Sequence, residues 1–260
     1  MNAVVLQRDM DWEEREAVRQ NFPILHQRAS VRPRSVVVPR YSALPGYAEL
    51  FNDLRILGST AVSTPDQFAV SAHLTQWFPL IEDLCLPAWW DVGSATVPDS
   101  EHGYVVKGET NSLKRLWSTH MFARSRDELS GVMSRVMDDT LVGTQKLIIR
   151  PFIPLEVVEE GINGVQATNE WRFMFMNGIG IGQGYYWSWV ENPPTATPPE
   201  ALALAKRAAA RLPCPFVCID VAKTLSGEWK VVEVNAGEQA GLSLIDPFEF
   251  YNNMAIVLRS

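Results

Sequence analysis

Phe216-Val-Cys-Ile-Asp-Val-Ala-Lys223 and Trp229-Lys-Val-Val-Glu-Val-Asn235 are two runs of β-forming residues near the end of the 260-residue chain. The Ser226-Gly227 pair between them predicts a turn, so the two runs are expected to pair as an antiparallel hairpin. A turn centred there places Asp220 directly opposite Glu233. Opposed carboxylates with Cβ atoms about 5 Å apart repel each other, and a divalent cation removes that cost. The hairpin therefore favours a cation site.

Asn235 extends this acidic pair, because side chains alternate with period two and Asn235 falls on the face of Glu233. Carboxylate and amide oxygens suit a hard ion such as Mg²⁺, which typically takes one or two carboxylates together with substrate phosphates. The same spacing also fits a plain hairpin whose acids face water or lysines. The opposite face is expected to be buried, and it carries Val217, Ile219, Val221, Val232 and Val234.

Composition sets bounds on the class of protein. The chain is 47% hydrophobic and 20% charged, as in an ordinary soluble globular protein with one large domain or two to three small ones. Its net charge of −7 argues against nucleic acid as the main partner. No stretch resembles a signal peptide or reaches membrane-spanning length, so we expect a cytoplasmic protein with no membrane contact. The oligomeric state is not indicated.

Residues 1–92 predict a small α/β domain, with strands at 4–6 and 35–39 and a helix over 46–57. Thr64-Pro-Asp-Gln67 has the spacing of a capping box and opens a helix expected to carry Phe68, Ala72 and Trp77. Arginines 32, 34 and 40 around the second strand suggest a basic patch for an anionic acid, although arginines at a solvated surface explain them equally well. Residues 92–100 are the best linker candidate.

Lys107 ends a predicted strand and is followed by a small, polar loop, Gly108-Glu-Thr-Asn-Ser-Leu-Lys114. Such a lysine can hold phosphates as a fixed point charge, with loop amides as further donors. A solvated lysine at a strand end fits the same pattern, because the loop lacks the P-loop spacing. Residues 146–150 form a buried-looking strand that enters Pro151-Phe-Ile-Pro-Leu-Glu156, whose prolines indicate a connector or hinge.

A second hairpin is predicted over residues 170–186, with Asn177-Gly178 as its turn. Glu170 and Arg172 point to the same side, and a turn at this position sets Arg172 opposite Gln183. The glycines at 180, 182 and 184 are expected to leave open surface beside Arg172. A simple surface ion pair between Glu170 and Arg172 is the alternative.

The order of these features resembles the ATP-grasp superfamily over roughly residues 60–250. It consists of a strand lysine, a strand running into a hinge with a downstream acid, Glu-x-Arg on a hairpin, and an Asp upstream of Glu-x-Asn. The resemblance implies an α+β fold in which two subdomains grip ATP, preceded by a small α/β domain. It divides the chain into an N-terminal domain, 1–92, and an ATP-grasp domain, 93–260. The latter comprises a lid or central subdomain at about 98–156 and a C-terminal subdomain at 157–260.

The resemblance also implies roles for individual residues. Lys107 would contact the ATP phosphates beneath a lid formed by 108–114, with Lys114 assisting, and Arg172 would act near the γ-phosphate. The chain departs from the family's usual hinge residues at Arg150-Pro151, so Arg150 is either a second phosphate ligand or a structural ion-pair partner. His73 stands where relatives often carry a lysine, and it is more simply a packed or capping residue. The remaining assignments are adenine at Pro151, Phe152 and Ile153, ribose at Glu156, and Mg²⁺ at Asp220, Glu233 and Asn235.

Such a site implies an enzyme that phosphorylates a carboxylate and lets an amine or similar nucleophile displace the phosphate, with ATP and Mg²⁺ as cofactors. The implied substrates are a small-molecule carboxylate and an amine, with an amino acid or a peptide among the candidates. Two alternatives keep the same scaffold. One is a small-molecule kinase that stops at phosphoryl transfer, and the other is a nucleotide-binding protein without turnover.

Overall fold

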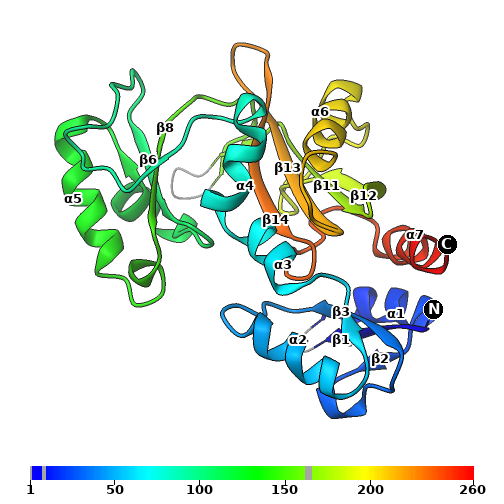
Figure 1. The fold of residues 1–260 in the computed structure, drawn as a ribbon. Coiled ribbons are helices and arrows are strands. Elements are labelled where there is room, and N and C mark those ends of the chain that lie inside the picture. The colour runs from blue at the N-terminus through cyan, green and yellow to red at the C-terminus, as the bar shows by residue number, and fades with distance from the viewer. Residues whose placement is uncertain (1, 8–9, 162–165) are drawn as a thin grey trace.

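The computed structural model describes residues 2–7, 10–161 and 166–260. Its described strands form three four-stranded sheets and one two-stranded ribbon, which joins β9 (Val157–Glu159) and β10 (Ala167–Thr168). Figure 1 shows three groups of elements, with α3 and α4 running between the lower group and the other two. The two termini lie near each other on one side of the molecule (Figure 1).

The N-terminal sheet is parallel throughout, in the order β2-β1-β3-β4. The predicted capping box is present, because the Thr64 side chain and the Gln67 side chain each bond the other residue's backbone N–H. The helix expected to reach Trp77 is instead two helices that meet at His73, whose backbone is extended. The elements are β1 (Asn2–Gln7), α1 (Trp12–Asn21), β2 (Ile24–Leu25), β3 (Ser35–Arg40), α2 (Tyr47–Ile56), β4 (Thr60–Ala61), α3 (Pro65–Ala72) and α4 (Leu74–Ile81).

The second sheet has the order β5-β8-β6-β7 and is antiparallel. Helix α5 packs on it through Leu129, Val132 and Val136, in a core with Val106 and Ile149. Its elements are β5 (Trp89–Trp90), β6 (Tyr104–Gly108), β7 (Phe122–Ala123), α5 (Arg126–Met137) and β8 (Leu147–Pro151).

The third sheet is antiparallel, in the order β12-β11-β13-β14. One face packs on α4 and α6, and the other packs on α7 and α1. The C-terminal helix α7 therefore ties this sheet to the first helix of the chain. Its elements are β11 (Glu170–Met176), β12 (Ile179–Tyr185), α6 (Pro199–Ala209), β13 (Phe216–Lys223), β14 (Trp229–Ala236) and α7 (Pro247–Arg259).

The predicted pairing of Asp220 with Glu233 is correct, but a β-bulge shifts the register on the turn side of this pair. Val221 pairs with Val231, so Val232 is the extra residue. The expectation that Val232 fills the core was therefore wrong. Val231 is fully buried there, whereas Val232 lines a cavity on the same side as Glu233.

A bulge also shifts the β11–β12 hairpin. Its turn is at Asn177-Gly178, where both residues have positive φ. The irregularity lies between Met174 and Phe175, so Arg172 pairs with Gly184 and the expected pairing with Gln183 was wrong. The surface at these glycines is not open either. A Cβ on Gly184 would lie 2.6 Å from backbone atoms of Leu244 and Ile245, because that segment packs directly on the strand.

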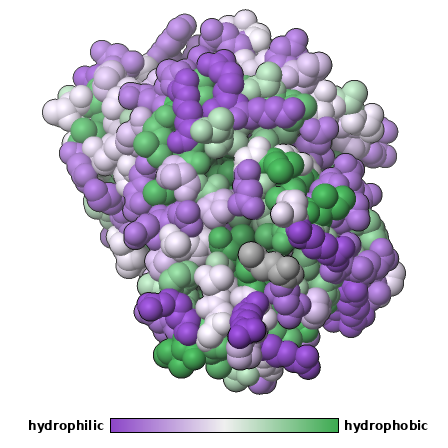
Figure 2. Space-filling model, turned by 45° about the vertical axis from the view of Figure 1, so that its right-hand side comes forward, coloured by the Kyte–Doolittle hydropathy of each residue, from purple (hydrophilic) through white to green (hydrophobic). Residues whose placement is uncertain are grey.

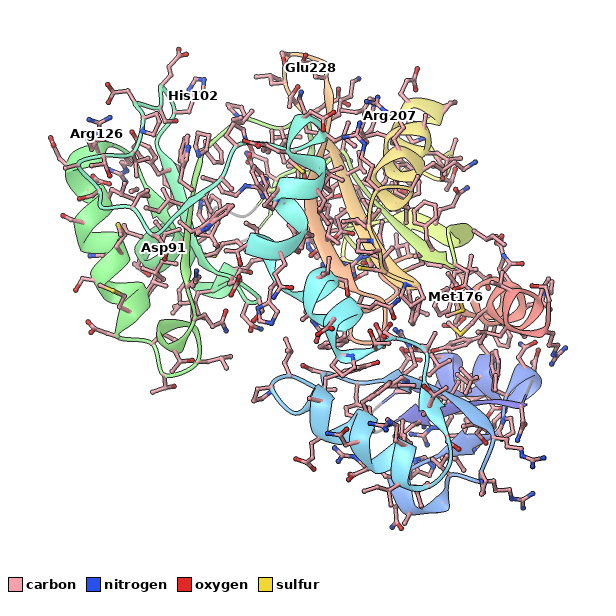
Figure 3. The ribbon with its side chains drawn as sticks, in the orientation of Figure 1. Asp91, His102, Arg126, Met176, Arg207 and Glu228 are labelled. Atoms are coloured by element: carbon pink, nitrogen blue, oxygen red, sulfur yellow. The ribbon has the colours of Figure 1, made fainter. Side chains whose placement is uncertain are left out.

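The division into domains at residues 92 and 93 stays a prediction. β5 pairs with β8, so residues 89 and 90 belong to the second sheet. Leu74, Trp77 and Phe78 of α4 pack in the core of the third sheet. The surface in Figure 2 shows apolar residues in small groups between polar ones. Figure 3 shows Glu228 at the tip of the β13–β14 hairpin and Arg126 on α5, at the outer ends of two different groups.

Candidate active site

A cavity of about 830 Å³ lies between the second and third sheets and the hinge that follows β8. It collects most of the predicted nucleotide-binding residues, which the sequence separates by more than a hundred positions. Three predicted residues, Arg172, Asp220 and Asn235, do not line it and lie in the strands of the third sheet. The predicted residues along its wall are Lys107, Lys114, Arg150, Pro151, Phe152, Ile153, Glu156 and Glu233, together with Glu170.

The hinge end of the cavity is aromatic. The rings of Phe122 and Phe152 meet edge to face with centroids 5.2 Å apart, and Trp117 stacks on Phe122 at 5.8 Å. The Phe152 N–H bonds the Gly103 carbonyl at 2.8 Å, so it is not free for a ligand. Within the described chain, the Ile153 N–H has no hydrogen-bond partner, which leaves a backbone donor beside an apolar wall.

Lys107 and Glu233 face each other at the polar end, with Nζ 2.5 Å from Oε1. β6 brings the lysine and β14 brings the glutamate, whose orientation into the cavity follows from the bulge at Val232. Burial acts to raise the pKa of Glu233, but the charges of Lys107, Lys114 and Arg172 outweigh it and hold this pKa well below its usual range. Glu233 is therefore ionised at neutral pH.

Lys114 reaches the same end from the loop after β6. Its Nζ donates to the Tyr186 hydroxyl at 2.8 Å and lies 4.8 Å and 5.4 Å from the ring centroids of Tyr186 and Trp187. Burial acts to lower the pKa of Lys114, but the charges of Tyr186, Glu233 and Glu170 outweigh it and raise this pKa above its usual value. The loop thus delivers a fixed positive charge to the acidic side chains.

Arg172 and Asp220 form a bidentate ion pair, with Nε to Oδ1 at 2.9 Å and Nη2 to Oδ2 at 2.8 Å. Asp220 has no exposed surface, and Arg172 is 8% exposed. The third donor group of the guanidinium, Nη1, bonds the Gly241 carbonyl at 2.7 Å. The guanidinium carbon also lies 4.7 Å from the ring centroid of Tyr186, so this tyrosine contacts the cations of both Lys114 and Arg172.

Glu170 lies on the same strand as Arg172 and is buried, with the Thr168 hydroxyl 3.3 Å from Oε2. Burial raises the pKa of Glu170 to about 7, and the charges of Asp220 and Glu233 add to this effect while Lys114 and Arg172 oppose it. The surface-pair alternative for Glu170 and Arg172 was wrong, because both residues are buried and Arg172 pairs with Asp220.

Arg150 has a structural set of partners. Its guanidinium donates to the carbonyls of Leu86, Pro87 and Val232 at 2.9, 3.3 and 2.6 Å. Burial lowers its pKa, and no carboxylate of the described residues forms an ion pair with it. The structural alternative for Arg150 was an ion-pair partner, whereas the structure gives it neutral carbonyls.

Glu156, proposed for ribose, pairs with Lys223 at 2.9 Å and accepts from the Asn169 side chain at 2.8 Å. These partners hold its pKa below the usual value, with the Lys223 contact as the largest cause. The carboxylate therefore sits ionised and oriented at the wall of the cavity.

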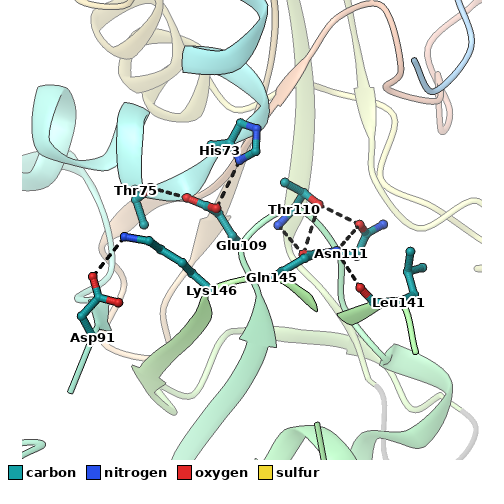
Figure 4. Close-up of polar contacts among 9 residues, drawn as sticks. All are labelled: His73, Thr75, Asp91, Glu109, Thr110, Asn111, Leu141, Gln145 and Lys146. Atoms are coloured by element: carbon teal, nitrogen blue, oxygen red, sulfur yellow. Dashed lines mark hydrogen bonds and ion pairs between the residues drawn. The ribbon is translucent and has the colours of Figure 1, made fainter. Parts of the chain in front are cut away.

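The loop after β6 is anchored at its base (Figure 4). The Glu109 carboxylate bonds the Thr75 hydroxyl and lies 3.2 Å from Nδ1 of His73. The Gln145 side chain accepts from the backbone N–H of Thr110 at 3.0 Å. His73 is thus an extended residue between two helices, and its ring contacts the predicted lid.

Tyr186, Trp187 and the aromatic residues 117 and 122 were not predicted as site residues. Tyr186 directly follows the predicted hairpin, so its position after the glycine-rich strand was a usable signal. Trp117 and Phe122 flank a π-helical turn, Trp117–Met121, which no sequence pattern announced. Their approach to the hinge depends on how the second sheet folds.

A family model described as an ATP-grasp domain, the third family of its clade, matches residues 89–254. The chain belongs to this family. The expected ATP-grasp fold is thereby confirmed, with mixed α and β elements in several sheets. No curated protein matches the chain. Among the described residues, no helix combines the length and apolar character that crossing a membrane requires.

Solved structures of ATP-grasp proteins share the fold over nearly the whole chain. D-cycloserine synthetase DcsG superposes with a TM-score of 0.62 at 14% identity, covering 98% of this chain and 99% of that one. A RimK domain protein from Sphaerobacter thermophilus gives 0.61 at 16% identity, covering 97% and 99%. The ATP-grasp ligase PsnB, complexed with a minimal precursor, gives 0.57 at 12% identity, covering 100% and 99%. At these identities the likeness concerns the fold alone.

Proposed function

We propose that this ATP-grasp protein is a ligase that activates a carboxylate with ATP and joins it to an amine or similar nucleophile. The observation that carries the proposal is the facing pair of Lys107 and Glu233 at one end of a cavity whose other end is an aromatic hinge. The cavity thus has an apolar end for a base and a charged end for phosphates, which suits a nucleotide.

In this proposal, adenine lies against Phe152 and Phe122 and accepts from the free Ile153 N–H. Glu156 binds the ribose hydroxyls at the cavity wall. Lys107 and Lys114 contact the phosphates, because both amines lie at the opposite end of the same cavity. When the triphosphate enters, Lys107 exchanges part of its contact with Glu233 for a phosphate oxygen.

The donor set fits Mg²⁺ with one rearrangement. Glu233 is ionised, and the Asn235 side chain has no hydrogen-bond partner among the described residues, so both can supply oxygens. Both oxygens of Asp220 are bonded to Arg172, and its proposed contact with the ion requires Arg172 to move. The described residues contain no ready-made cluster of three or more His, Cys, Asp or Glu ligands. When bound, Mg²⁺ would neutralise charge on the β- and γ-phosphates.

The proposed reaction has two steps. A carboxylate oxygen of the acid attacks the γ-phosphorus, the bond to the β–γ bridging oxygen breaks, and ADP leaves. The amine nitrogen then attacks the acyl carbon, phosphate departs with the electrons of the C–O bond, and the nitrogen loses a proton. Lys107, Lys114 and Arg172 offset the charge that grows on the transferred phosphoryl group. PsnB, a ligase of this fold, was solved with a precursor, which supports a peptide or amino acid as one substrate class.

The test is Glu233→Ala. We expect this variant to remain folded and to lose Mg²⁺-dependent ADP release by at least about 10²-fold, because the site loses a charge contact to the phosphates. The assay measures ADP with amino acids and peptides as acids and amines. Unchanged turnover in Glu233→Ala would rule the assignment out.

The same assay separates the alternatives. A kinase would yield a phosphorylated product that accumulates without any amine. A protein that only binds nucleotide would bind ATP and release no ADP with any substrate mixture.

A further inference from the structure

A tight turn follows the Glu-x-Asn motif directly. The N–H groups of Gln239 and Ala240 both bond the Ala236 carbonyl at 3.1 Å. Gly237 packs flat on the Phe216 ring, where an added Cβ would lie 2.4 Å from a ring carbon. The turn therefore begins one residue after Asn235, and it leads to Gly241, whose carbonyl is bonded by Arg172.

The N-terminal sheet holds this turn through Arg40, at the end of β3. Its Nη1 donates to the carbonyls of Gly237 at 2.6 Å and Ala240 at 2.9 Å. Its Nη2 pairs with Glu14 at 2.9 Å, and its Nε donates to the Tyr251 hydroxyl at 3.0 Å. The side chain is 4% exposed, so the idea that Arg40 belongs to a basic surface patch was wrong.

A second contact from the N-terminal sheet reaches the middle of the turn. The Ser63 hydroxyl donates to Oε1 of Glu238 at 2.5 Å, and the Tyr47 hydroxyl lies 3.4 Å from the same oxygen. Glu238 is 1% exposed. Its Oε2 is buried without a partner in the described part of the chain, so the two hydroxyls provide its only side-chain hydrogen bonds there.

We propose that Arg40 and Glu238 are positioning residues through which the N-terminal sheet sets the backbone of Asn235 and the guanidinium of Arg172. This inference rests on the proposed function of that site. The turn connects the two groups, because Asn235 precedes it and the Gly241 carbonyl that orients Arg172 follows it. A shift of about 1 Å at such groups can cost about 10²-fold in rate. The N-terminal domain is then part of the catalytic unit.

The experiment replaces Arg40 by methionine, which keeps the length of the side chain but removes all its donors. Hydrogen exchange of the ligand-free protein is followed at the amides of Gln239 and Ala240, and Mn²⁺ binding is measured with a non-hydrolysable ATP analogue. We expect exchange at least about ten-fold faster and Mn²⁺ binding about ten-fold weaker, with binding of the analogue in the absence of metal changed less than about two-fold.

Arg28→Met is the matched control. Arg28 lies in the same part of the chain and pairs with Glu49 and Asp53, at 2.8 and 2.6 Å, without contact to the turn. We expect no change in either readout. A second variant, Ser63→Ala with Tyr47→Phe, removes both hydroxyls from Glu238 and leaves Arg40 in place. It should also accelerate exchange and weaken Mn²⁺ binding, and it decides the question if Arg40→Met does not fold.

The outcomes are distinct. Equal exchange and equal Mn²⁺ binding in the variants and the wild type overturn the inference, as does the same change in Arg28→Met. If the wild type binds neither the analogue nor Mn²⁺, the proposed function fails. The exchange comparison in the ligand-free protein still decides whether Arg40 and Glu238 hold the turn.

Discussion

Glu170→Gln should make the protein more stable in alkaline solution and leave it unchanged in acid. An ordinary glutamate pKa is 4.5, and burial raises the pKa of Glu170 to about 7 in the folded protein. Below pH 4.5 the carboxyl is protonated in both the folded and the unfolded state. Above pH 7 it is ionised in both, and only the folded state bears the cost of the buried charge. Its contribution to stability therefore falls as pH rises from about 4.5 to about 7.

The magnitude follows from the two pKa values. Their difference corresponds to about 3 kcal/mol in the free energy of unfolding at pH 8. Glutamine has a similar shape and can still accept from the Thr168 hydroxyl, which lies 3.3 Å from Oε2 in the wild type. The substitution thus removes the charge and keeps the hydrogen bond.

The assay is urea unfolding of wild type and variant between pH 4 and pH 9, read as the difference between the two free energies of unfolding. Glu228→Gln is the control, because Glu228 lies at the exposed tip of the β13–β14 hairpin with 67% of its side chain accessible (Figure 3). A Glu170→Gln difference that stays flat with pH, or that grows only below pH 5, would refute the reasoning.

Three further substitutions test other parts of the site. Arg172→Met should lower the free energy of unfolding by about 3 to 5 kcal/mol, because it leaves the Asp220 carboxylate buried and unpaired; urea unfolding measures this, and a loss below about 1 kcal/mol contradicts it. Lys107→Met should reduce ADP release by about 10²- to 10³-fold and raise the pKa of Glu233, which NMR titration can follow; a normal rate would remove Lys107 from the phosphate site. Gly184→Ala should destabilise by about 1 to 3 kcal/mol, since its Cβ would lie 2.6 Å from neighbouring backbone; an unchanged midpoint of thermal unfolding would show that the backbone gives way.

The two hairpins could be predicted because their signals are local. Asn177-Gly178 forms the expected turn with positive φ at both residues, and Gly227 adopts φ of +93° in the loop that contains the second turn. Turn dipeptides and alternation fix which strands pair and near which residue. The opposition of Asp220 and Glu233 follows from that, and so does the assignment of the metal-binding candidates to one sheet.

The bulges could not be predicted in the same way. An extra residue such as Val232 costs the sheet one pairing position, and its gain comes from how the strand packs on other elements. Val231 is buried among residues of α4 and α6, contacts between segments far apart in sequence. Alternation alone placed Val232 in the core and could not detect the shift.

Arginine roles depend even more on distant partners. Arg40, Arg150 and Arg172 each lie in or at the end of a β-strand, and nothing in their local sequence separates them. Arg150 donates to three carbonyls, and a move toward a phosphate would leave buried acceptors unpaired at a cost of about 1 to 3 kcal/mol each. Arg172 exchanges a carboxylate contact for another anion at lower cost, because charge stays paired with charge. The positive charge at the phosphate end is therefore expected from Lys107, Lys114 and Arg172, and Arg150→Met should affect stability before nucleotide affinity.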